Sequence, residues 1–442
     1  MPAPLVPNVI FDPAETLPRP DLEALQLARL RRTVDHVRRA PFFQRELAAR
    51  GLTGDSLRSL DDVRRLPFTV KENLRAHYPL DLLAVPREDL ARIHGSSGTT
   101  GTPTFVAYTA KDLDTWSGLC ARFLRAGGLS PAHTVQISFG YGLFTGGFGL
   151  HYGAEMVGAA ILPAAAGNTD RQIQLLKDIG ADALVCTPSY ALTIAETMKK
   201  QGVSPGDLNL SLGFFGAEPW TEDMRVEIEK ELGILAFNNY GLSEVIGPGV
   251  SGECPYRDGM HVQEDNFIIE CLDPETLEPV PDGELGELVI TTINKEAMPF
   301  LRYRTRDIAR LNHEPCPCGR TGVRMSRVTG RSDDMLIIRG VNIFPSQIEE
   351  ALLRIEGVAP HYQIIVDRPG YLDELTVRVE IRPDSFSDEM RVMQQLRDRI
   401  ARRVQTVTGV RCAIELAPPE TLARFEGKAK RVVDRRLSKG GL

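Results

Sequence analysis

The spacing of apolar residues along the chain predicts most of its helices and strands. Residues 20–50 carry apolar side chains at helical spacing, with a break near Pro41. From 130 to 245, short apolar runs typical of strands alternate with longer runs typical of amphipathic helices. The expected strands are TVQISF (134–139), ADALVCTP (181–188), LSLGFFGAE (210–218) and ILAFNNYG (234–241), and the expected helices are IQLLKDIG (173–180), SYALTIAETMKKQG (189–202) and MRVEIEKELG (224–233). This alternation predicts a parallel, layered α/β sheet.

The pattern changes twice after this region. From 265 to 311, the short apolar runs NFIIECLD, GELGELVITTI and YRTRDIARL are separated by turn residues, which predicts a β-rich subdomain. From near 330, a helix (346–355), two strands (362–367 and 374–383), a long helix (388–407) and a last strand (411–417) have the size of a small α+β domain. Ser346, with Glu349 three residues later, predicts a capping box at the start of the first of these helices. We therefore expect an α/β protein with a large domain over 1–330 and a small domain over 331–442.

Composition narrows the class of protein without naming a reaction. Of the 442 residues, 42% are apolar and 25% are charged, as in an ordinary folded chain. The formal charge, 52 − 59 = −7, argues against nucleic acid or an anionic membrane as a partner. Seven cysteines, with no recognisable targeting signal, argue against a disulfide framework and favour the cytoplasm.

The stretch HGSSGTTGTPTF (94–105) is the first candidate for chemistry. Its glycines permit positive φ, so backbone N–H groups and the Ser and Thr hydroxyls can surround phosphate oxygens. It differs from the nucleoside-triphosphatase loop, because it has no Lys and a strand-like run, FVAYT, follows it instead of a helix. A flexible polar loop explains the composition equally well.

Four further blocks carry residues suited to nucleotide chemistry. Glu244 lies in the Gly-rich turn of NNYGLSEVIGPG, where a carboxylate can hold Mg²⁺ against phosphates. Asp307 lies in YRTRDIARL, GRSDDMLIIRG spans the domain boundary, and Lys428 follows Gly427 near the C-terminus. Each alone has an ordinary explanation as a turn, ion-pair or surface residue.

In this order and at these separations, the blocks resemble the adenylate-forming superfamily of acyl-CoA ligases, and most closely its phenylacetate–CoA ligase branch. The resemblance runs from ETLPRPDLEALQLARL through the loop, GYGLFTGGFGLHYGAE, FFGAEPW, YGLSEVIGPGV and GRSDDMLIIRGVNIFPSQIEE to GKAKRVVD. It implies that a carboxylate attacks the α-phosphate of ATP, that an acyl-adenylate forms and pyrophosphate leaves, and that the small domain then rotates as a lid so that coenzyme A attacks the adenylate.

The resemblance also implies a role for each matching residue. The phosphate loop is Ser96, Ser97, Gly98, Thr99, Thr100 and Gly101; the adenine platform is Gly216, Ala217, Glu218 and Pro219 with Asn239 and Tyr240. Glu244 binds magnesium, Asp307 and Arg331 bind the ribose hydroxyls, and Asp333 is the hinge. Lys428, preferred over Lys430 because Gly427 precedes it, is the adenylation lysine. Thr102 stands where the family usually has a loop lysine. Backbone N–H groups and Mg²⁺ remain to hold the phosphates, so the replacement is tolerable, and weaker ATP affinity or a different phosphate pose is left open.

The acid is expected to bind beside GYGLFTGG (140–147). Tyr141 and Phe144 can enclose an aromatic ring, with space left by Gly142, Gly216 and Gly241, although both aromatics could instead be ordinary core residues. The apolar stretch favours an aryl or arylacetic acid over a long fatty chain.

Two Cys-containing turns predict a second metal site. Cys254 and His261, in ECPYRDGMH, and Cys316 and Cys318, in EPCPCGRT, can form one tetrahedral Cys₃His zinc site of structural type. The alternative is two unrelated loops with free thiols.

The sequence thus predicts an ATP-dependent aryl-acid–CoA ligase. Transfer of the acyl group to a carrier protein, adenylyl transfer to another acceptor, and a non-catalytic nucleotide-binding homologue remain as alternatives. The oligomeric state is left open, with a homodimer among the candidates.

Overall fold

The computed structural model describes residues 4–96, 104–338, 341–368, 373–387, 389–424 and 431–436. The chain divides into two compact units. Unit 1 comprises Met1–Cys186, Pro205–Ala217 and Ile234–Arg327; unit 2 comprises Thr187–Ser204, Glu218–Gly233 and Val328–Leu442. The division at 330/331 stays a prediction, since the contacts also group two earlier segments with the C-terminal one.

Unit 1 is built on a mixed sheet in the order β13-β14-β9-β8-β7-β6-β5-β3-β4. The pairs among β7, β6, β5, β3 and β4 are parallel, and those from β7 outwards to β13 are antiparallel. The strands are β3 (Thr134–Ile137), β4 (Ala160–Leu162), β5 (Ala183–Cys186), β6 (Leu212–Phe215), β7 (Leu235–Leu242), β8 (Gly247–Glu253), β9 (Met260–Val262), β13 (Leu311–Asn312) and β14 (Arg324–Met325). The fully buried strands β5 and β6 are the continuous apolar runs that the pattern predicted.

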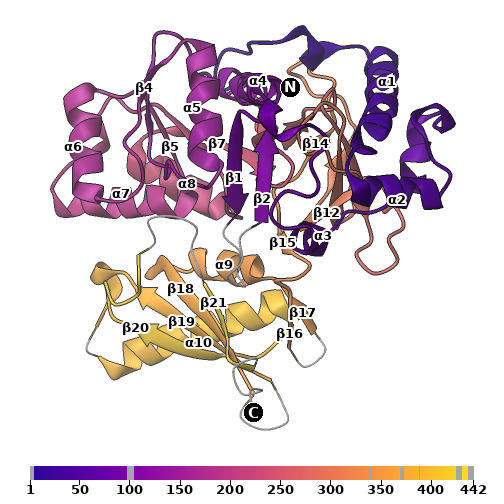
Figure 1. Ribbon diagram of the computed structural model, residues 1–442. Helices are drawn as coiled ribbons and strands as arrows, with labels where there is room; N and C mark the ends of the chain where they lie inside the picture. The colour runs from indigo at the N-terminus through magenta and orange to yellow at the C-terminus, as the bar shows by residue number, and fades with distance from the viewer. Residues whose placement is uncertain are drawn as a thin grey trace. The chain divides into compact units, whose positions relative to one another are not determined.

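Further elements of unit 1 surround this sheet. An antiparallel sheet contains β10 (Phe267–Leu272), β11 (Gly286–Thr292) and β12 (Tyr303–Ala309), which confirms the expected β-rich region. A separate antiparallel pair joins β1 (Arg92–Ser96) to β2 (Thr104–Tyr108). The helices are α1 (Arg19–Val37), α2 (Pro41–Ala49), α3 (Lys71–Ala76), α4 (Ala110–Ala126), α5 (Gly146–Val157) and α6 (Thr169–Ile179). Helices α4 and α5 pack against each other (Figure 1).

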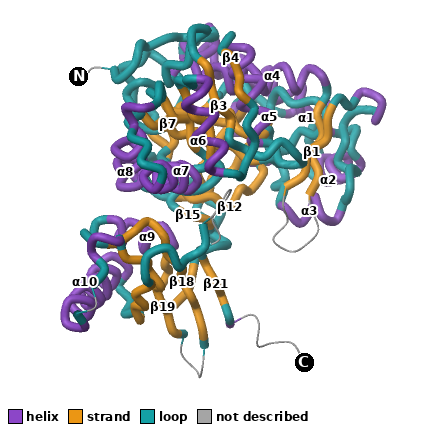
Figure 2. Tube along the Cα trace, turned by 90° about the vertical axis from the view of Figure 1, so that its left-hand side faces the viewer, coloured by secondary structure: helices purple, strands orange, loops and turns teal. Residues whose placement is uncertain are grey.

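Unit 2 has its own apolar core. Its sheet runs β20-β19-β18-β21, and α9 and α10 lie on one side of it (Figure 2). The elements are α7 (Pro188–Lys200), α8 (Glu222–Leu232), β16 (Leu336–Ile338), β17 (Val341–Ile343), α9 (Pro345–Leu353), β18 (Val358–Asp367), β19 (Glu374–Ile381), α10 (Met390–Thr408), β20 (Ala413–Ala417) and β21 (Val432–Asp434). Apolar residues of α9, α10 and the sheet form one cluster, which confirms the small α+β domain.

The capping box predicted at Ser346 is wrong. Helix α9 begins one residue earlier, with Pro345 as its first residue and Phe344 as its N-cap. Pro fits that position because its missing N–H would have no helical partner there. Gln347 accepts a hydrogen bond from the Phe344 N–H (2.9 Å), and Glu349 is instead a buried ion-pair residue.

No helix in the described ranges combines the length and the apolar character needed to cross a bilayer.

Candidate active site and metal site

The turn that carries Glu244 is held from several directions. It links β7 to β8, and four of its successive carbonyl groups accept side-chain hydrogen bonds. Tyr108 Oη donates to Ile246 O (3.0 Å) and, more weakly, to Ser243 O (3.4 Å), while Lys295 Nζ donates to Val245 O (2.9 Å) and Glu244 O (3.3 Å). The turn is therefore rigid, and it presents the Glu244 carboxylate in a fixed position.

The Glu244 carboxylate is buried and paired with a lysine. Its Oε1 lies 3.0 Å from Lys71 Nζ at the start of α3, and its side chain is 8% exposed. Because a buried charge needs a partner of opposite sign, this lysine is the counter-ion that the position of Glu244 requires.

Tyr240 and Asp307, which the sequence analysis placed around the nucleotide, lie together. Tyr240 Oη donates to Asp307 Oδ2 at 2.7 Å, and both side chains are buried. Asn239, the residue before Tyr240, donates from Nδ2 to Phe215 O (2.9 Å) at the end of β6. Close approach of the backbone fixes Gly241, because a Cβ there would lie 1.9 Å from Gly247 O. Strands β6, β7 and β12 thus bring together Asn239, Tyr240 and Asp307, three of the residues predicted to bind the nucleotide.

The loop 140–147 forms a partly open aromatic wall. The Tyr141 ring meets Phe148 edge-on with centroids 5.4 Å apart, and Tyr141 Oη lies 3.1 Å from His151 Nδ1. Phe144 is 41% exposed, so it is not a core residue, and Gly142 beside it is exposed too. Tyr141 is half-buried, which raises the pKa of its hydroxyl and keeps it neutral.

The same loop is tied to the strand that precedes the phosphate loop. Gly95 N–H donates to Leu143 O (2.9 Å), and His94 Nδ1 lies 3.1 Å from the same oxygen. Hydrogen bonds therefore join the end of β1 to the loop that carries Tyr141 and Phe144.

The four predicted zinc ligands come together in unit 1. The ligand atoms of Cys254, His261, Cys316 and Cys318 all lie within 4.8 Å of one another, and all four residues are buried. The Cys254 and Cys316 sulfurs are 3.7 Å apart, and Cys318 Sγ lies 3.3 Å from His261 Nε2. His261 Nδ1 is 3.1 Å from Gly322 O, which fixes the tautomer that leaves Nε2 free to bind a metal. The two turns therefore lie together in space, and the zinc site itself stays a prediction.

The N-terminal segment is fastened onto the second cysteine turn by Arg320. Its guanidinium donates to Glu15 Oε2 (2.6 Å), Asn8 Oδ1 (3.0 Å) and Val9 O (2.6 Å). Asn8 Nδ2 in turn donates to Cys318 O (2.7 Å). The Arg320 and Glu15 side chains are 4% and 3% exposed, so this is a buried ion pair.

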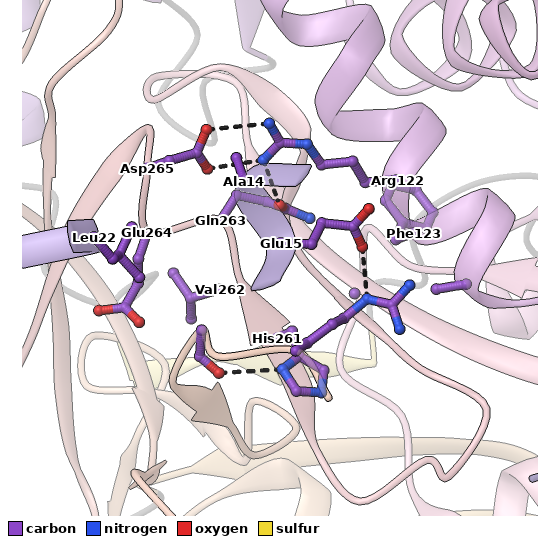
Figure 3. Close-up of a pocket in the computed structure, with 14 residues that line it drawn as sticks. Ala14, Glu15, Leu22, Arg122, Phe123, His261, Val262, Gln263, Glu264 and Asp265 are labelled. Atoms are coloured by element: carbon purple, nitrogen blue, oxygen red, sulfur yellow. Dashed lines mark hydrogen bonds and ion pairs between the residues drawn. The ribbon is translucent and has the colours of Figure 1, made fainter. Parts of the chain in front are cut away.

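A small polar cavity lies beside this segment (Figure 3). Glu15, Arg122 and Asp265 line it, and His261 lies at one edge. Arg122 bridges Asp265 (2.8 Å) and Asp12 (2.7 Å). The cavity volume of about 20 Å³ holds a single water molecule, so this is not a substrate site.

Replacing Arg320 by methionine is expected to lower the free energy of unfolding by about 3–5 kcal/mol, because Glu15 would remain buried without its cation. Chemical denaturation measures the loss, and limited proteolysis should show faster cleavage within residues 5–16. Arg310→Met is the matched control, since Arg310 is exposed and donates only to Gly283 O among the hydrogen bonds that its side chain makes in the described structure. Equal stability of the two variants would contradict the assigned role of Arg320.

Comparison with known proteins identifies the family. The model of AMP-binding enzymes matches residues 25–295, and that of the AMP-binding enzyme C-terminal domain matches residues 340–436. The phenylacetate-coenzyme A ligase of Thermus thermophilus is 50% identical over 96% of this chain and 98% of its own, and that of Escherichia coli is 46% identical over 98% and 99%. The chain belongs to the AMP-binding enzyme family.

A solved structure extends the match to the fold. A 2-hydroxyisobutyryl-CoA ligase in the postadenylation state, in complex with 2-HIB-AMP, superposes with a TM-score of 0.92 at 30% identity, covering 99% of this chain and 94% of the other. The resemblance to phenylacetate–CoA ligases and the α/β fold class are confirmed. The enzyme class, an acid–thiol ligase that forms AMP, is confirmed as well.

Of the predicted platform residues, Gly216 and Ala217 follow β6 in unit 1, whereas Glu218 and Pro219 belong to unit 2 of this AMP-binding enzyme, as do Arg331 and Asp333. Glu218 Oε1 accepts a hydrogen bond from the Ser189 N–H at the start of α7 (2.7 Å), and Pro219 is exposed. Arg331 and Asp333 form a bidentate ion pair with distances of 2.9 and 3.0 Å. The predicted ribose and hinge residues are thus in contact with each other.

Several predicted residues of this AMP-binding enzyme fall outside the described ranges. They are Ser97, Gly98, Thr99, Thr100 and Gly101 of the phosphate loop, Thr102, and Lys428. Ser96 ends β1, and its backbone is paired with Thr104 of β2. The phosphate loop therefore joins two antiparallel strands, as expected from the strand-like run that follows it.

The sequence analysis missed Lys71 and Lys295. Lys295 is buried beneath the Glu244 turn, with its ammonium 4.8 Å from the centre of the Tyr108 ring. Burial lowers its pKa to about 8, against the opposing effect of the Asp112 and Glu244 carboxylates. Its only sequence signal is a lysine close to the buried strand β11, which is too common a pattern to be informative.

Proposed function

We propose that this chain activates a small aryl acid, with phenylacetate as the first candidate, and transfers the acyl group to coenzyme A. The observation that carries the proposal is the 45–50% identity to phenylacetate-coenzyme A ligases along nearly the full chain. ATP supplies the adenylyl group, and pyrophosphate and AMP are the products.

The aromatic wall supports an aryl acid. Tyr141 is held by Phe148 and His151, so its ring has a fixed orientation and a neutral hydroxyl. Phe144, exposed beside Gly142, is free to pack against a bound ring. Because Leu143 O accepts from Gly95 N–H, the acid would lie next to the loop that we assign to the phosphates.

The nucleotide would be held by the ends of β7 and β12. The Asp307 carboxylate would accept hydrogen bonds from the vicinal ribose hydroxyls, and the hydrogen bond from Tyr240 Oη orients it. Glu244 fits a Mg²⁺ ion, because one buried carboxylate together with substrate phosphates is a common magnesium site. When bound, Mg²⁺ supplies positive charge to the phosphate oxygens. Lys71 is paired with Glu244, and the hydrogen bonds from Tyr108 and Lys295 to the carbonyl groups of the turn hold its backbone in place.

We also assign a structural Zn²⁺ to the cysteine cluster. Zn–S bonds of about 2.3 Å in a tetrahedron separate two sulfurs by about 3.8 Å. The 3.7 Å between Cys254 and Cys316 fits that geometry, and four protein donors leave no open position. All seven cysteines are among the described residues and none is in a disulfide, which supports a reducing compartment such as the cytoplasm.

The purified protein is expected to form phenylacetyl-CoA, with release of AMP and pyrophosphate that requires both the acid and Mg²⁺. Pyrophosphate release and product mass are measured over a panel of phenylacetate, benzoate, aminobenzoates and hydroxylated relatives, with and without coenzyme A.

The panel separates the alternatives. Adenylate that accumulates with no thioester in the presence of coenzyme A would favour a carrier protein or another acceptor. Nucleotide binding without pyrophosphate release from any acid would indicate a non-catalytic homologue and would contradict the proposal. Thr102 in place of the usual lysine predicts a high KM for ATP in the same assay.

A further inference from the structure

Thr145 carries a buried hydroxyl group that the proposed mechanism has not used. It is the N-cap residue of α5, a position where a Thr side chain commonly accepts a hydrogen bond from the first turn of the helix. Here the side chain makes no such bond, and the residue is 1% exposed. Its Oγ1 lies instead 2.8 Å from the Oγ of Ser243, which is buried as well. The Thr145 hydroxyl therefore forms its hydrogen bond away from its own helix.

The partner in this hydrogen bond belongs to the turn that carries Glu244. Ser243 is the residue before Glu244, and the turn joins β7 to β8. The other end of the turn is close to Thr145 too, because a Cβ on Gly247 would lie 3.1 Å from the Thr145 Cβ. Gly247 has a φ of +108°, and the absence of a side chain permits this approach. Thr145 therefore packs against both ends of the turn.

The residues before Thr145 form the aromatic wall. Phe144 directly precedes Thr145, and most of the loop from Gly140 to Phe144 is exposed. Packing against the rest of unit 1 therefore does little to hold this loop. Two hydrogen-bonded points hold it instead, one at Leu143 O, which accepts from the Gly95 N–H (2.9 Å), and one at the Thr145 hydroxyl. The loop and the Glu244 turn belong to the same unit.

The hydrogen bond at Thr145 controls position more than affinity. The Tyr141 ring is oriented by contacts with Phe148 and His151, and these contacts do not involve the Thr145 hydroxyl. An aryl ring bound at the wall would keep them if that hydroxyl were lost. The place of the wall relative to the Glu244 turn, in contrast, depends on Thr145. A small error in the relative position of two reactants slows their reaction strongly, even where both remain bound.

We propose that Thr145 is a positioning residue for adenylation, whose hydroxyl acts through Ser243 to hold the acid-binding loop beside the turn that carries Glu244. The inference rests on the proposed function, which assigns the aryl acid to this loop and Mg²⁺ to Glu244. Without the hydrogen bond, the acid and the nucleotide would still bind, but the carboxylate and the α-phosphate would be misaligned. The rate of adenylate formation at saturating substrates would then fall, while both affinities stay.

The test uses Thr145→Val in the full-length enzyme, because valine has nearly the shape of threonine and lacks the hydroxyl. Its single-turnover rate of phenylacetyl-adenylate formation, at saturating phenylacetate and Mg²⁺–ATP, is expected to fall about tenfold, the scale of one hydrogen bond. The Kd of phenylacetate and the Kd of ATP, both measured by calorimetry, should not change. Thr145→Ser keeps the hydroxyl and should retain the wild-type rate, which separates the hydrogen bond from packing of the methyl group.

Ser243→Ala removes the same hydrogen bond from the other side. It should slow adenylation at least as much as Thr145→Val does. If Thr145 acts through Ser243, adding Thr145→Val to Ser243→Ala should cost nothing further, whereas independent roles would multiply the two losses. This comparison holds whatever Ser243→Ala costs by itself, so it does not depend on Ser243 having a single role.

The matched control is Thr291→Val. Thr291 is a buried residue of β11 in unit 1, and its Oγ1 accepts a hydrogen bond from the Arg302 N–H (2.9 Å). This variant also loses a buried hydroxyl, and its adenylation rate and both Kd values should match those of the wild type.

The inference and the proposed function fail in different ways. Adenylation at the wild-type rate in Thr145→Val or in Ser243→Ala would overturn the inference. So would a further loss of rate when the two changes are combined, or a loss in Thr145→Val that arises only from weaker binding of phenylacetate. A wild-type enzyme that forms no adenylate from any acid would overturn the proposed function instead.

Discussion

Replacing Lys428 by alanine is expected to slow acyl-adenylate formation at least about a hundredfold, the scale of losing one preorganised donor at a developing charge. The α-phosphate gains charge as the acid attacks and pyrophosphate leaves, and a lysine delivered by the C-terminal segment can compensate that charge. Single-turnover release of pyrophosphate from phenylacetate and ATP measures the step directly.

The second half-reaction gives the internal reference for this variant. Thioester formation from supplied phenylacetyl-adenylate should remain near the wild-type rate. In that step the thiol attacks the acyl carbon and AMP leaves, so no pyrophosphate is displaced and the charge that Lys428 compensates does not develop. Lys430→Ala is the matched control, two residues further along the same segment, and it should retain adenylation. Normal adenylation by Lys428→Ala, or a larger loss in Lys430→Ala, would refute the assignment.

Elements with strong periodicity were predictable from the sequence. The strands that became β5 and β6 are apolar throughout because both faces are covered, and α1 buries Leu22, Gln26, Leu30 and Val34 at helical spacing. In such segments local preference and tertiary burial favour the same structure, so the pattern alone is sufficient.

Helix α5 could not be predicted in this way. GYGLFTGGFG reads as a glycine-rich loop, and glycine weakens a helix by about 1 kcal/mol per residue. The glycines are there because α4 and α5 approach closely: a Cβ on Gly153 would lie 2.4 Å from the Cβ of Cys120. Packing between the two helices therefore overrides the low propensity. The start of α9 at Pro345 instead follows local chemistry, because proline at the first position of a helix gives up no helical hydrogen bond.

Residues of the candidate site could be selected from the sequence only where the residue type and its local motif together point to one role. Glu244, Tyr240 and Asp307 were selected from the sequence because of an acid in a Gly-rich turn and a family motif, and their roles stay predictions. Lys295 and Arg320 were not selected, because each contacts residues that lie far away in the sequence. Arg320, for example, fastens Glu15 from 305 positions along the chain. Lone lysines and arginines of this kind become informative only when the fold shows their partners.

Replacing Cys254 by serine is expected to abolish zinc binding and to lower the free energy of unfolding by about 3–5 kcal/mol, as loss of a structural metal does. The ion would join the turns around 254–261 and 316–322, and the N-terminal segment is attached to both. Leu5 N–H donates to Pro255 O (3.0 Å), and Asn8 Nδ2 donates to Cys318 O (2.7 Å). Loss of zinc should therefore also expose residues 5–16, in addition to its effect on stability.

Elemental analysis of the dialysed protein, denaturation and limited proteolysis measure these three effects together. The wild type should contain about one zinc ion per chain, as four protein donors in one cluster require. Cys271→Ser is the matched control, because Cys271 is buried in unit 1 and is no member of the cluster.

A strong chelator should reproduce the Cys254→Ser phenotype in the wild type and leave an already metal-free Cys254→Ser unchanged. A wild-type protein that contains no zinc after growth in zinc-supplemented medium, and that unfolds identically with and without chelator, would contradict the metal assignment. The N-terminal segment is attached by the Arg320–Glu15 ion pair and by its hydrogen bonds to the cysteine turns. Arg320→Met removes the ion pair and keeps every metal ligand, so faster cleavage of residues 5–16 in that variant, with zinc still bound, would distinguish the two attachments.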